Sequence, residues 1–173
     1  MMVMNHLETL TAEWLAYNGY FTRSGIRVGK RPKGGWEGEL DVVGFHPAHQ
    51  HFIHVECSTD AWTWQKREET FQRKFAMGRI HAPELFAGME LPTAIDQVVV
   101  HGFAGAANNH RELGGGRFMT SQELAAEIMN NIPVSITKTA VPENFPLMRT
   151  LQLSIMAGAD VAMSDVRLIP KRS

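Results

Sequence analysis

Apolar and polar positions along the chain follow two periods, and each period predicts a different kind of element. Apolar residues recur at spacings of three and four, as in amphipathic helices, in the segments 5–18, 60–80, 121–132 and 146–157. The segments 38–45 and 52–58 alternate as strands do, while 96–103 is a short apolar run typical of a buried strand. Residues 20–28 read as a further strand, irregular around Gly25, and 134–138 are a candidate for a last one.

The ends of the predicted helices carry recognisable signals. Asn5 is suited to cap the first helix, and Gly19 is suited to end it. Any of Ser58, Thr59 and Asp60 can cap the second helix. Thr120 or Ser121 caps the third, Pro146 starts the fourth, and Gly158 ends it.

The order of predicted elements is α-β-β-β-α-β-α, followed by a C-terminal extension. This order predicts an α/β fold with a central mixed sheet flanked by helices. A chain of 173 residues suits a single domain, with its core in about residues 5–130 and an extension at 138–173 whose role is open. The glycine- and asparagine-rich segment 104–116 is predicted to be a mobile surface loop.

Composition narrows the class of protein. No apolar run is long enough to span a membrane and the N-terminus does not read as a signal peptide, so we expect a cytoplasmic protein. The single cysteine, Cys57, excludes an internal disulfide framework and a multi-cysteine zinc site. Because the net charge is −1, a nucleic-acid partner would need a local basic surface.

The predicted hairpin 38–58 carries acids on otherwise apolar strands. If its turn is centred between Ala48 and His49, Asp41 pairs with Glu56. Two like charges about 4 Å apart repel by about 4 kcal/mol at an effective dielectric of about 20. A divalent cation between the carboxylates reverses the sign of this energy, and oxygen ligands suit Mg²⁺ or Mn²⁺.

Two other interpretations of this region stay open. In the first, the acids face solvent beside neighbouring lysine or arginine side chains. The histidines of the turn, His46, His49 and His51, are potential zinc ligands, although three of them in a turn lack a matching cysteine set. His54 differs from these because it shares the face of Glu56, where it is suited to touch substrate or hold a water.

The segments LETLTAEWLAYNGY, GELDVVGF and HFIHVECS, followed by a basic amphipathic helix, resemble the PD-(D/E)XK nuclease superfamily. Restriction endonucleases and Holliday-junction resolvases belong to it. The resemblance covers about residues 5–130 and implies a restriction-endonuclease-like core. It also implies hydrolysis of phosphodiester bonds in DNA with Mg²⁺ or Mn²⁺ as cofactor.

The resemblance assigns roles to individual residues. Asp41 matches the aspartate of the second strand and Glu56 the acid of the third, so both are expected to bind the metal. Glu8 matches a glutamate of the first helix that often completes the site, with Glu13 as a weaker candidate, although the spacing of Glu8 from Asn5 also fits a capping box. The backbone carbonyl of Cys57 is expected as a further metal ligand.

The sequence departs from the superfamily pattern at two positions. Leu40 stands where the motif has proline. Ser58 stands where the motif has its lysine, and the superfamily tolerates this loss when a lysine arrives from the following helix. Lys66 is the nearest basic residue of that helix and is the expected catalytic cation, with Lys74 as the alternative further along.

Substrate contacts are expected from a basic turn and the second helix. Lys30, Arg31 and Lys33 in the turn, with Arg73 and Lys74 on the helix, are candidates to bind DNA phosphates, and RNA is not excluded. Cutting of a duplex usually takes two sites, so a homodimer is expected. The alternatives are an inactive nucleic-acid-binding protein on a nuclease fold and an unrelated α/β module that binds protein or a small ligand.

Overall fold

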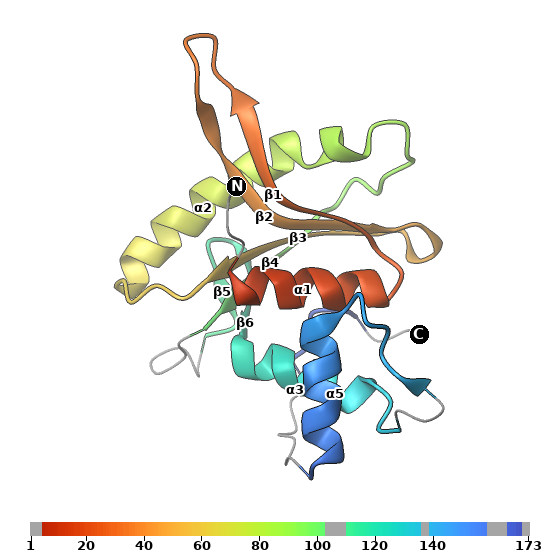
Figure 1. Ribbon diagram of the computed structural model, residues 1–173. Helices are drawn as coiled ribbons and strands as arrows, with labels where there is room; N and C mark the ends of the chain where they lie inside the picture. The colour runs from red at the N-terminus through yellow and green to blue at the C-terminus, as the bar shows by residue number, and fades with distance from the viewer. Residues whose placement is uncertain (1–4, 103–109, 136–138, 159–165, 171–173) are drawn as a thin grey trace.

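The computed structural model describes residues 5–102, 110–135, 139–158 and 166–170, and it contains a mixed sheet of six strands (Figure 1). The order across the sheet is β1-β2-β3-β4-β6-β5. β1, β2 and β3 form an antiparallel meander, β4 and β6 continue in parallel, and β5 runs antiparallel to β6. The bounds are β1 (Phe21–Lys30), β2 (Trp36–His46), β3 (His51–Ser58), β4 (Asp96–His101), β5 (Glu112–Leu113) and β6 (Gly116–Thr120).

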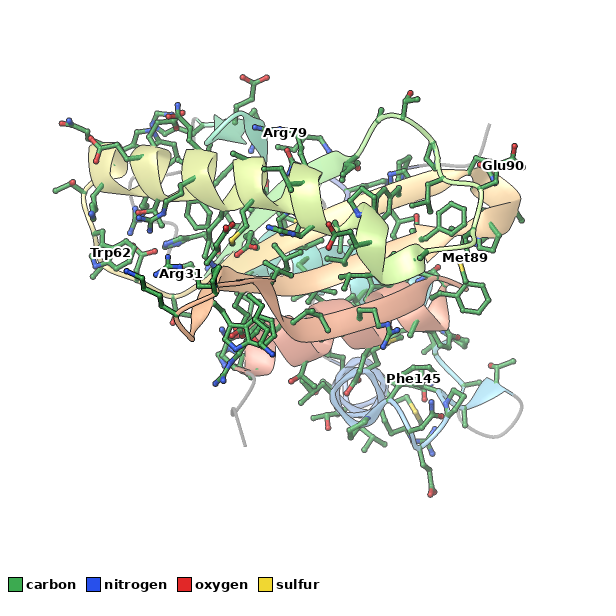
Figure 2. The ribbon with its side chains drawn as sticks, turned by 90° about the horizontal axis from the view of Figure 1, so that it is seen from above. Arg31, Trp62, Arg79, Met89, Glu90 and Phe145 are labelled. Carbon is green, nitrogen blue, oxygen red and sulfur yellow. The ribbon has the colours of Figure 1, made fainter. Side chains whose placement is uncertain are left out.

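Helices cover both faces of the sheet, which confirms the predicted mixed α/β class. The view from above shows α2 on one face and α1 on the other, with α5 packed outside α1 (Figure 2). The helices are α1 (His6–Tyr17), α2 (Trp64–His81), α3 (Ser121–Asn131) and α5 (Pro146–Met156), and short 3-10 turns occupy Pro47–His49 and Pro83–Phe86. None of the described helices combines the length and apolar character that crossing a membrane requires.

The apolar core is divided between the two faces. On the α1 side, side chains of α1, α3 and α5 pack with Val42, Val55 and Val98 of the sheet. On the α2 side, Phe71 and Phe75 pack against β4 and β6. Because β3 and β4 lie between helices on both faces, nearly all of their residues are buried, the polar ones included.

Most predicted helix ends are confirmed. The Asn5 side chain accepts the N–H groups of Leu7 and Glu8, and Gly19 adopts φ +87° just after α1. Thr120 and Glu123 form a reciprocal capping box at the start of α3. Satisfying the first backbone donors fixes where a helix begins.

The predicted start of α2 is wrong. The helix begins at Trp64 with Thr63 as its N-cap, not at residue 60. Ser58, Asp60 and Arg67 bond to one another instead: the Ser58 hydroxyl and the Arg67 Nε both donate to the Asp60 carboxylate. This network holds the chain in a loop between β3 and α2.

The prediction of a surface loop over residues 104–116 is also wrong for the part that the structure describes. Residues 112–120 contain β5 and β6, so the part predicted as surface loop and described here is a hairpin at the sheet edge. A Cβ on Gly114 would lie 2.5 Å from the Phe71 Cβ, and one on Gly116 would lie 2.4 Å from a Phe75 ring carbon. These glycines let the hairpin approach α2 closely. Residues 103–109 lie outside the described part.

The last predicted strand is not formed where it is described. Val134 and Ser135 are not part of a strand, and residues 136–138 lie outside the described residues. The sequence leaves the role of the C-terminal extension open. In the structure, its described part packs on α1 and α3. Its helix α5 contributes Met148 to the core on that face, and Leu168 is fully buried there.

Candidate active site

The sheet forks at the position of the predicted acids. The β2–β3 ladder has the predicted register, with Val43 opposite His54, and it ends at the pair Val42–Val55. Past this pair, β2 continues as a hairpin with β1, while β3 continues beside β4. The arm formed by β1 and β2 projects beyond the rest of the sheet (Figure 1). Such a fork opens space between two strands that would otherwise be filled by their hydrogen bonds.

Asp41 and Glu56 are the first residues past the end of this ladder, and they are brought together with Lys74 of α2. Asp41 is 6% exposed and Glu56 is fully buried. Lys74 Nζ lies 3.4 Å from each carboxylate oxygen of Asp41 and donates a short hydrogen bond to Glu56 Oε2. Asp41 Oδ2 also accepts the N–H of Cys57 at 2.8 Å, which satisfies a backbone donor that the fork leaves without a β2 partner.

The electrostatics of the three groups are tightly coupled. Burial, and then the neighbouring charge of Glu56, raise the pKa of Asp41 to about 8, although Lys74 opposes them. Burial works to raise the pKa of Glu56 too, but hydrogen bonds from His54 and Lys74 prevail and lower it. Burial tends to lower the pKa of Lys74, and the two acids reverse this and raise it. Two carboxylates with divergent pKa values beside one cation are typical of a functional site.

The cation at this site is Lys74 and not the expected Lys66. Lys66 lies eight residues earlier, about 12 Å along the helix axis. It is exposed in the first turn of α2, where its backbone N–H bonds Thr63. The position of the motif lysine, Ser58, bonds Asp60 and serves the β3–α2 loop.

Glu8 approaches the fork from the α1 side. Its carboxylate accepts a hydrogen bond from the Asn5 side chain at 2.5 Å and one from the Asn5 backbone, so its capping role is present. Burial raises the pKa of Glu8 and the backbone hydrogen bond from Asn5 opposes the rise, while the charges of Glu39 and Glu56 add to it and that of Lys74 opposes it. The capping role and proximity to the acids, which the sequence presented as alternatives, therefore coexist. A metal-binding role for Glu8 stays a prediction.

Cys57 presents its side chain to the opposite face from the acids. Its Sγ lies 3.6 Å from Thr11 Oγ1 of α1, and burial raises the pKa of the thiol. The thiol is therefore a packed, neutral group. The role expected for Cys57 involves its backbone carbonyl and stays a prediction.

A polar chain behind Glu56 was not found from the sequence. His54 Nε2 lies 2.7 Å from Glu56 Oε1, and its Nδ1 lies 3.3 Å from the Gln97 side chain. All three residues are buried. The two-residue spacing of His54 and Glu56 on one strand indicated their shared face, but Gln97 comes from β4 and gave no such signal.

A pocket of about 360 Å³ lies between the β1–β2 arm and α2. Arg31, Arg73 and Lys74 line it, together with the acids Glu37 and Glu39. Figure 2 shows Arg31 where the arm approaches the helix. Of the five basic residues expected to bind DNA, these three converge on one pocket, while Lys30 and Lys33 are exposed on the arm outside its lining.

The donor set at the fork restricts which metal would fit. Within the described residues, no group of three or more histidine, cysteine, aspartate and glutamate side chains is placed to hold a metal ion. Mg²⁺, however, binds through one or two carboxylates and keeps several waters. Asp41 and Glu56 fit that requirement and do not fit tetrahedral zinc, provided that the Lys74 ammonium moves away from Glu56.

The turn histidines have other partners. His51 bonds the Tyr20 hydroxyl at 2.6 Å and Asp96 at 3.1 Å. His46 accepts the backbone N–H of His49 at 3.2 Å. These contacts give the cluster a structural role in joining the start of β3 to β4.

Comparisons with known proteins add little to this geometry. No protein-family model and no curated protein matches the chain. The chain is similar to the solved structure "Crystal Structure of Protein of Unknown Function AF1548", with 12% sequence identity and a TM-score of 0.45. The match covers 88% of this chain and 97% of that one.

Proposed function

We propose that the protein is a metal-dependent nuclease that hydrolyses phosphodiester bonds in DNA, built on a restriction-endonuclease-like core. The observation that carries the proposal is the convergence of Asp41, Glu56 and Lys74 at the fork of β2 and β3. Two strand carboxylates and a lysine are what the resembled superfamily uses. The sequence lacks the lysine at Ser58, and Lys74 brings a cation to the same acids from the following helix.

In this proposal each residue has a separate task. Asp41 and Glu56 hold Mg²⁺ or Mn²⁺, which when bound lowers the pKa of a coordinated water and neutralises charge on the phosphate oxygens. Lys74, freed from Glu56, donates to the attacking water or to a phosphate oxygen and stabilises the negative charge of the transition state. The Cys57 N–H keeps the Asp41 carboxylate oriented.

The charge distribution favours a substrate that approaches between the β1–β2 arm and α2. Arg31 and Arg73 stand on either side of the pocket that leads to Lys74. Lys30 and Lys33 extend this basic surface along the exposed arm. A chain of net charge −1 needs a local excess of cations to attract a phosphate backbone, and the three cations of the pocket outnumber its two acids, Glu37 and Glu39. Action on a duplex, through a homodimer with two such sites, stays part of the proposal.

The test is nicking of supercoiled plasmid with Mg²⁺, Mn²⁺ or EDTA. We expect cutting with either metal, none with EDTA, and none above background in Asp41→Asn or Glu56→Gln. Glu69→Gln is the matched control, because Glu69 is an exposed acid on the outer side of α2 that bonds Gln65. Normal cutting by Asp41→Asn would refute the assignment of the site. A labelled RNA strand in parallel reactions separates deoxyribonuclease from ribonuclease activity.

One observation favours a second function, that of a nucleic-acid-binding protein without catalysis. Both oxygens of Glu56 are engaged, one by His54 and the other by Lys74, and burial raises the pKa of Asp41 to about 8. A site neutralised in this way has less need of a metal. Salt-sensitive binding of DNA in a mobility-shift assay, without nicking under any metal, would select this function over the first.

A further inference from the structure

A chain of hydrogen bonds runs from Arg79, which is exposed, through the buried residues Gln97 and His54 to Glu56, and its directions fix the position of one proton. Arg79 Nη1 donates to Gln97 Oε1 at 2.7 Å, and Gln97 Nε2 donates to the backbone carbonyl of Phe75 at 2.9 Å. Arginine only donates and a carbonyl only accepts. These two partners therefore determine which end of the Gln97 amide is oxygen and which is nitrogen.

The orientation of Gln97 then determines the tautomer of His54. The Gln97 nitrogen lies 3.3 Å from His54 Nδ1, and an amide nitrogen only donates. His54 Nδ1 must accept, so the imidazole proton is on Nε2. Nε2 lies 2.7 Å from Glu56 Oε1 and donates to it. The direction of each bond follows from the one before it.

The packing of α2 is consistent with a fixed imidazole. A Cβ built on Gly78 would lie 2.2 Å from His54 Nδ1, so only glycine lets the helix lie over the ring. Glycine inside a helix costs about 1 kcal/mol relative to alanine. Its presence in α2 is explained by this close approach. The Phe75 ring contacts the imidazole edge-on, with centroids 5.6 Å apart.

We infer that His54 is a positioning residue, locked by Gln97 as the Nε2–H tautomer, which holds Glu56 with its second oxygen directed at Asp41 and Lys74. The inference rests on the proposed function in so far as Glu56 is a metal ligand. His54 itself touches neither metal nor substrate. Partners that orient a metal ligand in this way typically contribute 10- to 100-fold, roughly, to metal affinity.

The tautomer is tested without metal or substrate. Nitrogen chemical shifts of ¹⁵N-histidine-labelled protein report which ring nitrogen of His54 carries the proton, with His54→Gln used to assign its signals. We expect a protonated Nε2 and an unprotonated Nδ1 in the unmodified protein. In Gln97→Leu we expect these shifts to move toward those of exchanging tautomers. A proton on Nδ1 in the unmodified protein would overturn the inference, whatever Gln97→Leu does.

The positioning role is tested by titrating Mn²⁺ into two variants calorimetrically. In His54→Gln the longer amide places a nitrogen donor near the Nε2 position, whereas the shorter amide of His54→Asn falls near Nδ1 and does not reach Glu56. We expect His54→Gln to bind Mn²⁺ nearly as the unmodified protein does, and His54→Asn to bind about 10- to 100-fold more weakly. Equal affinities in the two variants would overturn the positioning role. Absence of Mn²⁺ binding in the unmodified protein would instead count against the proposed function. The nitrogen chemical shifts would then still test whether Gln97 sets the tautomer of His54.

Discussion

The two faces of the sheet each bury a pair of carboxylates, and the pairs have opposite surroundings. On the α1 side, Glu13 accepts the backbone N–H groups of Leu147 and Met148 at the start of α5. Glu127 accepts the Trp14 indole N–H at 3.0 Å and the N–H groups of Leu168 and Ile169. These two acids come from different helices and attach the C-terminal extension to the fold.

On the α2 side, the carboxylates face each other instead of backbone donors. Asp41 and Glu56 compete for one ammonium group, and within the described residues a single backbone N–H, from Cys57, reaches Asp41. Burial raises the pKa of Glu127 as it does that of Asp41, but several N–H donors oppose the rise at Glu127. Burial of an acid is therefore not what marks a site. What indicates a site is a pair of acids that repel each other and that the fold nevertheless holds close together at the fork.

Removing the charge of Lys74 should show most clearly that the two pairs of acids have different roles. Lys74→Met keeps the unbranched apolar part of the side chain and removes its charged end, so we expect plasmid nicking to fall about 10²–10³-fold. Lys66→Met, on the exposed first turn of the same helix, is the matched control and should cut at the rate of the unmodified protein. The measurement is the initial rate of nicking, with helix content checked by circular dichroism. Equal rates in both variants would mean that the α2-side acids are as structural as the α1-side pair.

Truncating Glu127 should affect stability and not the site. Glu127→Ala leaves Trp14 Nε1 and two backbone donors of the extension without their acceptor, and we expect the free energy of unfolding to fall by about 3 kcal/mol. Glu143→Ala, at an exposed position, should change it by less than about 0.5 kcal/mol. Urea unfolding measures both. If Mn²⁺ affinity of folded Glu127→Ala also fell, the two faces would not be independent.

The sequence predicted those parts that local periodicity and short loops determine. The helix caps at Asn5 and Thr120 follow from neighbouring residues, and the register that places Asp41 beside Glu56 follows from the length of one turn. The sequence offers Lys74 only as an alternative to Lys66, because the choice between them depends on how α2 lies across the sheet. That orientation is set by tertiary packing, including the contact of Gly78 with His54.

The edge hairpin and the Gln97 chain were missed for a related reason. β5 is two residues long, and the glycines beside it indicate a loop when read locally. Their meaning appears only when Phe71 and Phe75 lie against them. Gln97 stands in an apolar strand, and its partners come from α2 and β3. Residues whose role is a long-range contact carry no local pattern.

The smallest expected effect is on how stability depends on pH. Asp41 and Glu56 should change this dependence in opposite directions, because the pKa of Asp41 is raised and that of Glu56 is lowered. The pKa of Asp41 is raised from 3.8 to about 8 in the folded protein, so the folded state binds the proton more tightly than the unfolded state. Its contribution to stability is complete below about pH 4 and is lost as the pH rises toward 8. Asparagine does not ionise, so Asp41→Asn should not lose stability as the pH rises toward 8. Its amide keeps an oxygen that can accept the Cys57 N–H, but the variant lacks the ion pair with Lys74.

We therefore expect Asp41→Asn to be more stable than the unmodified protein by about 1 kcal/mol at pH 8, with the difference shrinking toward pH 5. Urea unfolding at several pH values, without divalent ions, measures it. Glu56→Gln should show the opposite dependence, because the pKa of Glu56 is lowered and its stabilising charge is present above about pH 4.5. Parallel stability curves for the unmodified protein and Asp41→Asn would show that Asp41 is charged at neutral pH. Lys74 and the Cys57 N–H would then be sufficient to keep Asp41 ionised despite its burial.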